Sequence, residues 1–137
     1  MKDWQEKIND LGQQGLSVQV EKNGTVVFQS SAPMLKPLFV CLNEKKEEMQ
    51  GATVIDKIVG LAAAYLCVLG KVREVITPLA SESAREMLQR HHIDLRATKI
   101  IAEIRNRENT DQCPMEKLAF SCHSPQEFYN KLTKKYF

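Results

Sequence analysis

The Asn23-Gly24 dipeptide constrains the fold more than any other feature of this chain, because it lies between two short β-rich segments. Asn-Gly favours the positive φ angles of a two-residue type I′ turn, so residues 17–22 and 25–30 are predicted to pair as a β-hairpin. A two-residue turn sets Val20 opposite Val27. The second strand has apolar side chains at consecutive positions, so both of its faces are apolar. The hairpin therefore predicts a sheet with helices on both sides.

A long uncharged run, residues 58–70, predicts a central helix. The run follows Asp56, ends at Gly70 and is apolar nearly all round, which is typical of a helix buried inside a protein. A membrane-spanning helix needs about 20 apolar residues, so this run is too short to cross a bilayer. We therefore expect a buried helix that begins just after Asp56, and no membrane partner.

Local signals predict the elements on either side of the hairpin. Asp3 followed by Glu6 resembles a capping box at the start of a short opening helix. Residues 31–51 contain two prolines and a charged run at 43–48, which favours a connection with one short helical turn. The charged run is expected to be a solvated face.

The second half of the chain alternates strand and helix signals. Residues 72–77, closed by Pro78, and residues 97–104 predict two strands. Further helices are predicted to begin at Ser81, Pro114 and Pro125. This alternation implies right-handed crossovers, so we expect a three-layer α/β/α sandwich, its mixed sheet of about four or five strands beginning with the hairpin.

Composition narrows the class of protein. A length of 137 residues with ordinary composition predicts a single domain over residues 1–137. The chain has 19 Lys and Arg against 17 Asp and Glu, and a net charge of +2 is too small to favour nucleic acid as a partner. Four cysteines without CxxC spacing, and a charged N-terminal segment unlike a secretory signal, favour a reduced, cytoplasmic location. The apolar central helix and the C-terminal aromatic residues favour a homodimer; these residues are Phe128, Tyr129, Tyr136 and Phe137.

Four motifs taken together resemble a small bacterial family that is classed as a domain of unknown function. They are Asp56-Lys57-Ile58-Val59-Gly60 with Ala62-Ala63-Ala64, Ser81 with Ala84 and Leu88, Asn106-Arg107, and Cys113-Pro114-Met115-Glu116. The resemblance runs from about the hairpin to the Cys-Pro-Met-Glu segment. It implies a cytidine-deaminase-like fold, in agreement with the order of elements read from periodicity and turns.

The zinc chemistry of deaminases is not expected to accompany that fold. Zinc deaminases use a His or Cys on one helix, two cysteines of a Pro-Cys-x-x-Cys on the next, and a Glu as general acid and base. The corresponding helix starts here, residues 54–57 and 78–81, contain neither thiol nor imidazole. We therefore predict no metal and no cofactor.

Cys113 and Asp56 are the candidate catalytic residues. A thiol just before a helix N-terminus is favoured as thiolate by the unpaired amides, so Cys113 is a candidate nucleophile or redox-sensitive group. Asp56 is a candidate proton acceptor at the mouth of the sheet, and its structural alternative is a carboxylate that complements the helix dipole.

Ligand-binding roles are assigned to five further residues, namely Lys57, Ser81, Asn106, Arg107 and Glu116. Each has a structural alternative. Ser81 is also a helix N-cap, and Glu116 is placed to cap the amide of Cys113. The alternative for Lys57 is a solvated amine in the first turn of the buried helix, and that for Asn106 and Arg107 is a surface or interface role.

Two functions from different classes fit these observations. The first is a pocket for a small polar or nucleobase-like ligand, either purely for binding or as a thiol-dependent enzyme without zinc. The second is a non-catalytic sensor or interaction module that keeps the fold. The sequence leaves open whether the protein is an enzyme.

Overall fold

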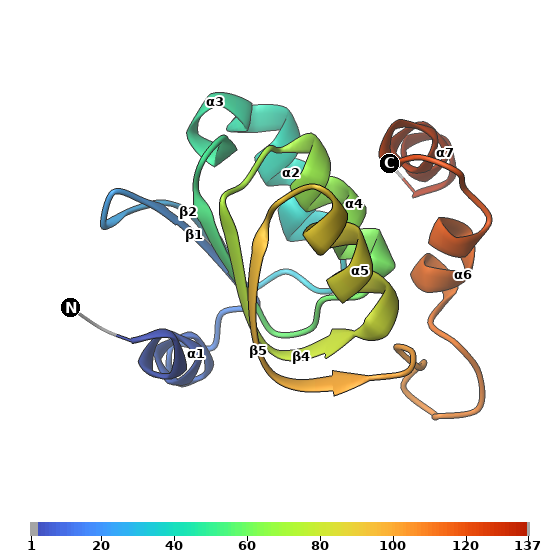
Figure 1. Cartoon of the computed structure of the whole chain (residues 1–137), viewed down its shortest axis with the longest axis horizontal. Helices are drawn as coiled ribbons and strands as arrows, with labels where there is room; N and C mark the ends of the chain where they lie inside the picture. Colours follow the sequence, from blue (N-terminus) through green and yellow to red (C-terminus); the bar gives the residue numbers. More distant parts are fainter. Residues whose placement is uncertain (1–2, 137) are drawn as a thin grey trace.

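A five-stranded mixed sheet forms the centre of the protein in a computed structural model, which describes residues 3–136 (Figure 1). The strands are β1 (Val18–Lys22), β2 (Thr25–Ser30), β3 (Thr53–Asp56), β4 (Glu74–Ser81) and β5 (Asp94–Ile101), in the spatial order β2-β1-β3-β4-β5. The pairs β2–β1 and β1–β3 are antiparallel, whereas β3–β4 and β4–β5 are parallel. The expected mixed sheet that begins with a hairpin is therefore confirmed. Residues 1–2 and 137 of the predicted single domain lie outside the described residues.

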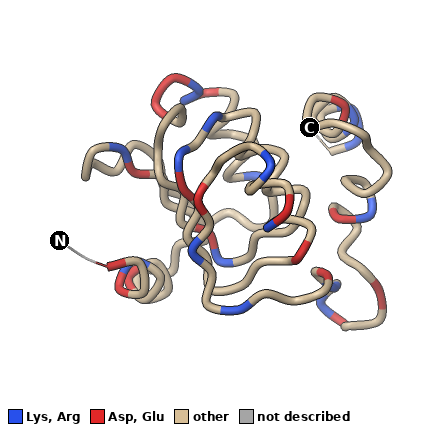
Figure 2. Tube along the Cα trace, viewed as in Figure 1, with Lys and Arg blue, Asp and Glu red and all other residues tan. Residues whose placement is uncertain are grey.

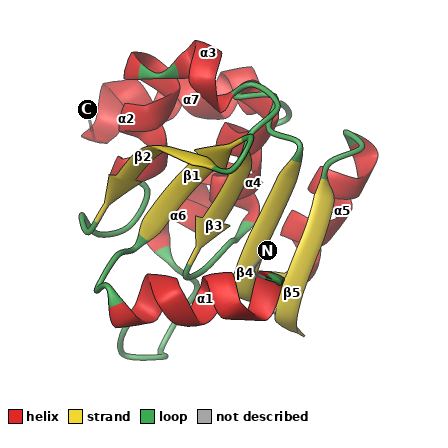
Figure 3. Cartoon of the chain, turned by 90° about the vertical axis from the view of Figure 1, so that its left-hand side faces the viewer, coloured by secondary structure: helices red, strands yellow, loops and turns green. Residues whose placement is uncertain are grey.

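Helices cover both faces of the sheet, so the predicted three-layer sandwich is also confirmed (Figures 1 and 3). On one face lies α1 (Trp4–Gln13), which packs Trp4 and Ile8 against a small core that includes Ile55 and Ile76. The helices on the other side are α2 (Lys36–Glu44), α3 (Lys46–Met49), α4 (Leu61–Leu69), α5 (Glu82–Arg90), α6 (Pro114–Phe120) and α7 (Pro125–Tyr136). The main core lies on this side, around α4.

The hairpin has the expected turn, but the pairing of residues between its two strands differs from the prediction. Asn23 and Gly24 both adopt positive φ, of 54° and 78°. A β-bulge then sets Val20 opposite Phe28 rather than Val27, so the predicted Val20–Val27 pair is wrong. With the bulge, both Val27 and Phe28 pack against the main core, which strict alternation would not allow.

The central helix begins four residues later than predicted, at Leu61. Residues 53–56, for which no element was predicted, form the buried strand β3, and the next residues continue as extended backbone before the helix begins. Val59 pairs with Ala80 in an isolated parallel bridge, and its N–H donates to the carbonyl oxygen of Leu79 at 2.9 Å. Asp56 therefore ends a strand and does not lie in the first turn of a helix.

Residues 31–51 contain more helix than predicted. Both α2 and α3 lie there. Pro37 does not prevent the first of these helices, because it stands in the first turn of α2, where a proline is tolerated. Buried Leu38 and Cys41 then hold α2 against the core. The charged run at 43–48 is exposed, as expected.

The two later strands also differ from their predicted bounds. The strand β4 continues through Pro78, and Oγ1 of Thr77 accepts a hydrogen bond from the N–H of Leu79 at 3.2 Å, just beyond the proline. The strand β5 begins and ends three residues earlier than expected, at Asp94 and Ile101.

The apolar features that suggested a homodimer are largely used within the chain. Leu61–Cys67 of α4 are buried, and Phe128 is fully buried with its ring centroid 5.5 Å from that of Tyr65. Phe137 lies outside the described residues. Tyr136, by contrast, is 39% exposed, and the homodimer stays a prediction. No helix within residues 3–136 has the length and apolar character needed to cross a membrane.

Candidate functional site

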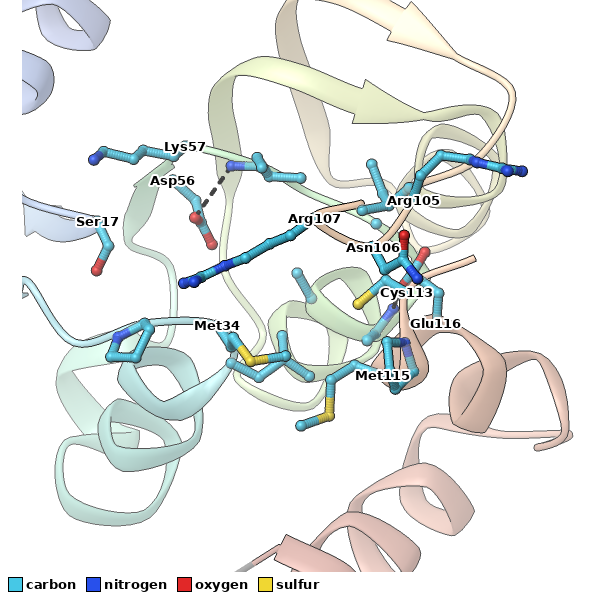
Figure 4. Close-up of a pocket in the computed structure, with 18 of the residues that line it drawn as sticks. Ser17, Met34, Asp56, Lys57, Arg105, Asn106, Arg107, Cys113, Met115 and Glu116 are labelled. Atoms are coloured by element: carbon cyan, nitrogen blue, oxygen red, sulfur yellow. Dashed lines mark hydrogen bonds between the residues drawn. The ribbon is translucent and has the colours of Figure 1, made fainter. Parts of the chain in front are cut away.

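A pocket of about 680 Å³ lies at the carboxyl end of β3 (Figure 4). Five segments line it: Ser17 before β1, residues 31–35 before α2, residues from 56 to 63 around the start of α4, residues 104–108 after β5, and residues 113–116 at the start of α6. Six of the seven predicted site residues line this pocket, namely Asp56, Lys57, Asn106, Arg107, Cys113 and Glu116.

Asp56 supplies a buried carboxyl group to the pocket. Asp56 is the last residue of β3, and its Oδ1 accepts a hydrogen bond from the N–H of Ile58 at 3.4 Å. The residue is 7% exposed and forms no ion pair with the described residues. Burial raises the pKa of Asp56 from 3.8 to about 7, and backbone N–H groups of Ile58 and Lys57 counter this only in part. Near neutral pH this carboxyl group can therefore both donate and accept hydrogen bonds.

Glu116 does not cap Cys113 as predicted. Its carboxylate reaches α4 instead, where Oε1 accepts from the N–H of Leu61 and Oε2 from the N–H of Ala62, each at 2.8 Å. Burial raises the pKa of Glu116, while these two hydrogen bonds lower it. Both carboxylate oxygens are thus occupied in satisfying the first amides of α4, so Glu116 holds α6 against α4.

Cys113 lies at the N-cap of α6, with Pro114 as the first helical residue, as predicted. Its N–H donates to the carbonyl oxygen of Ile104 at 2.9 Å, which ties the start of α6 to the segment after β5. The residue is half-buried, and its Sγ points into the pocket (Figure 4). Within the described chain, no side chain forms a hydrogen bond with this thiol, so no general base stands beside it in the present arrangement.

Asn106 organises the loop that bounds one side of the pocket. Its Oδ1 accepts from the N–H of Thr110 at 3.0 Å, and its Nδ2 donates to Oγ1 of Thr110 at 3.1 Å. The backbone N–H of Asn106 also donates to the carbonyl oxygen of Asp111 at 2.9 Å. The amide side chain thus shapes the turn in which Arg107 stands.

Lys57 and Ser81 are placed differently from the other candidates. Lys57 lines the pocket through its position beside Asp56, but its exposed side chain points away from the Asp56 carboxyl (Figure 4). Ser81 is buried, does not line the pocket and caps α5, because its Oγ accepts from the N–H of Ala84 at 3.1 Å. Capping accounts for the serine at this position.

The sequence did not single out the exposed apolar residues at this pocket. Met34 is 61% exposed and has a φ of 60°, which is unusual for a residue with a Cβ, and Ile58 is 48% exposed. Nothing in the sequence indicated that either residue would line a pocket. Met34 lies in a proline-containing connection, and Ile58 was read as part of the buried helix.

The donor set of the site does not fit a deaminase-type zinc ion. The first turns of α4 and α5 contain neither His nor Cys, and the first amides of α4 are occupied by Glu116. Across residues 3–136, no three His, Cys, Asp or Glu side chains gather as a possible metal site.

Comparison with known proteins identifies the family. The model for TM1506, described as a domain of unknown function (DUF1893), matches residues 6–136. The chain belongs to the DUF1893 family. No curated protein matches it.

Two solved structures are similar to this DUF1893 chain. The crystal structure of a DUF1893 family protein (TM1506) from Thermotoga maritima aligns with a TM-score of 0.86 and 23% identity, over 96% of this chain and 88% of the other. This likeness shows a shared fold. Acinetobacter baumannii RibD aligns with a TM-score of 0.48 and 14% identity, over 95% of this chain and 39% of that protein.

Proposed function

We propose that the pocket binds a small nucleobase-like molecule, with the Asp56 carboxyl group contacting its polar edge and without a deaminase-type zinc ion. One observation carries this proposal. A carboxyl group that is 7% exposed lines a pocket of about 680 Å³ and forms no ion pair with the described side chains. Burying a carboxyl group is costly, the backbone N–H groups of Ile58 and Lys57 offset this cost only in part, and a bound ligand can supply a further hydrogen bond.

The rest of the lining suits a flat, partly apolar molecule. Apolar side chains dominate it, including Met34, Ile58, Ile104 and Met115. Ligand pockets typically combine such a lining with a few polar groups that fix orientation. A nucleobase has an apolar face and adjacent donors and acceptors on its edge, and a carboxyl group that titrates near neutrality can pair with either arrangement.

A non-catalytic binding or sensing role has more support than a thiol-dependent reaction. Glu116 is occupied by the amides of α4, and the thiol of Cys113 has no hydrogen-bonded base among the described residues. Nucleophilic catalysis by a thiol needs such an activating partner. Because all four cysteines are free thiols, we also propose a reducing, cytoplasmic location.

Calorimetric titration with the common nucleobases and nucleosides tests the proposal. At least one of them should bind the wild-type chain, and Asp56→Ala should weaken that binding about tenfold or more, because a buried hydrogen bond to a carboxyl group is lost. Asp56→Asn keeps one donor and one acceptor, so it should retain part of the affinity.

Asp94→Asn is the matched control, since Asp94 is an exposed carboxylate at the opposite end of the sheet. It should bind as the wild type does. If no nucleobase or nucleoside binds, or if Asp56→Ala binds as tightly as Asp94→Asn, the proposed role of the pocket is wrong.

A further inference from the structure

We infer that Arg107 forms an oxyanion subsite at the mouth of the same pocket, an inference that rests on the proposed nucleobase site. The preferred ligand is then a nucleoside monophosphate rather than a free base. Two side chains, one acidic and one basic, then contact different parts of the ligand. Asp56 contacts the polar edge of the base, and the guanidinium of Arg107 contacts the phosphate.

Arg107 is free to take a ligand. It is exposed, lines the pocket and forms no hydrogen bond or ion pair with any other residue of the described chain. Its side chain does not extend away from the protein but lies across the pocket towards Asp56 (Figure 4). Among the described residues no ion pair joins the Arg107 guanidinium to the Asp56 carboxyl, so the two charged groups do not satisfy each other.

Arg105 shows what a structural arginine looks like in the same loop. It also lines the pocket, but its guanidinium bonds Glu103 at 2.6 Å and the side chain of Asn109 at 3.2 Å, and it points away from the pocket (Figure 4). Acidic residues are thus close enough in this segment to pair with an arginine, and Figure 2 shows both signs of charge along it. Arg107 nevertheless stays unpaired, even though Glu108 follows it directly and lines the pocket too.

The loop holds Arg107 in place through the residue before it. Asn106 makes side-chain hydrogen bonds to Thr110 and a backbone hydrogen bond to Asp111, which close the turn that contains Arg107. A guanidinium on an ordered backbone loses less entropy when it binds than one on a mobile loop. Its planar fork matches two oxygens of a phosphate or carboxylate, which favours an oxyanion over a neutral polar group.

Paired titrations of each nucleoside and its 5′-monophosphate test this inference. The monophosphate should bind about tenfold or more tightly than the nucleoside, as expected for charge-assisted hydrogen bonds. Arg107→Gln should abolish the difference between the monophosphate and the nucleoside, whereas Arg105→Gln should preserve that difference. Added salt should shrink the difference in the wild type, because the subsite is exposed.

The outcomes separate this inference from the proposed function. If nucleosides bind but the phosphate adds no affinity, or if Arg105→Gln removes as much affinity as Arg107→Gln, the oxyanion subsite is wrong and the base site stands. Inorganic phosphate that binds in an Arg107-dependent way without any nucleoside binding would support the subsite and overturn the base site. If neither nucleosides, monophosphates nor inorganic phosphate bind, both are wrong.

Discussion

Gly60 lies directly against the carboxylate of Glu116, so that a Cβ at position 60 would collide with it. Even the more distant of the two oxygens, Oε2, would lie 2.7 Å from that Cβ. The two residues are 56 positions apart in the sequence, and the contact joins the start of α4 to α6. The backbone of Gly60, with φ of −99° and ψ of −170°, is available to any residue, so the requirement for glycine here is one of space.

Gly60→Ala should therefore destabilise the protein by about 1–3 kcal/mol, the usual cost of forcing extra atoms into a packed site. Urea denaturation measures the change. Gly12→Ala is the matched control, because a Cβ at that position of α1 would meet no atom within 4 Å. A Gly60→Ala protein as stable as Gly12→Ala would show that the carboxylate can move aside without cost.

Glu116→Gln should also destabilise the protein, by about 1–3 kcal/mol, because an amide nitrogen cannot accept a hydrogen bond from a backbone N–H. The same urea titration, with the exposed Glu108→Gln as the comparison, measures the loss. In a Glu116→Ala background the steric cost of Gly60→Ala should largely disappear, because the carboxylate that the new Cβ would meet is gone. The effects of substitutions at two residues in contact are not additive. Equal costs of Gly60→Ala in both backgrounds would mean that Glu116 is not the group it meets.

Features set by a few adjacent residues could be predicted from the sequence. The Asn23-Gly24 turn and the start of α6 at Pro114 depend on local φ preferences, and both are where the sequence indicated. The role of Glu116 could not be predicted, because a capping residue was sought three positions away and its actual partners are 54 and 55 positions away. Likewise the bulge beside Val20 depends on how β2 packs against the core.

The candidate site was predictable to the extent that strand ends and helix starts mark pockets. Asp56 and Cys113 were chosen on that ground and line the same pocket, although Asp56 ends a strand that the sequence did not separate from the following apolar run. The same rule selected Ser81, but β4 ends in the core, where the serine is a cap. Met34 lies beside the pocket only through the path of the connection before α2.

Stability should fall as the pH rises from about 4 to about 7, in part because Asp56 titrates in that range. The folded-state pKa of about 7 lies above the ordinary 3.8, so the folded protein binds the proton more tightly than the unfolded chain does. The stabilising effect is complete below the lower value and is lost as the pH passes the higher one, with an upper limit of about 4 kcal/mol.

Comparing the wild type with Asp56→Asn isolates this effect, because the amide does not titrate and other buried groups such as Glu116 are common to both proteins. The difference in unfolding free energy between the two should shift in favour of Asp56→Asn between about pH 4 and 7. Parallel pH profiles would show that Asp56 titrates no higher in the folded protein than in the unfolded chain.

Protein purified without chelator should contain far less than one zinc ion per chain, since the described residues offer no convergent set of three His, Cys, Asp or Glu side chains. Elemental analysis of the wild type and Cys113→Ser checks this. One zinc ion per wild-type chain that is absent from Cys113→Ser would contradict it and would make the thiol a metal ligand.

Iodoacetamide should alkylate Cys113 before the other cysteines, and nucleoside binding should then be lost because the added group fills part of the pocket. Cys113 is half-buried, whereas Cys41, Cys67 and Cys122 are buried. Burial also raises the pKa of Cys41 to about 11 and raises that of Cys67, which suppresses the reactive thiolate at both. Peptide mass spectrometry identifies the modified thiol, and a ligand in the pocket should slow its reaction. Cys113→Ser, treated in the same way, should keep its binding; if alkylated wild-type protein does so too, Cys113 does not face the ligand.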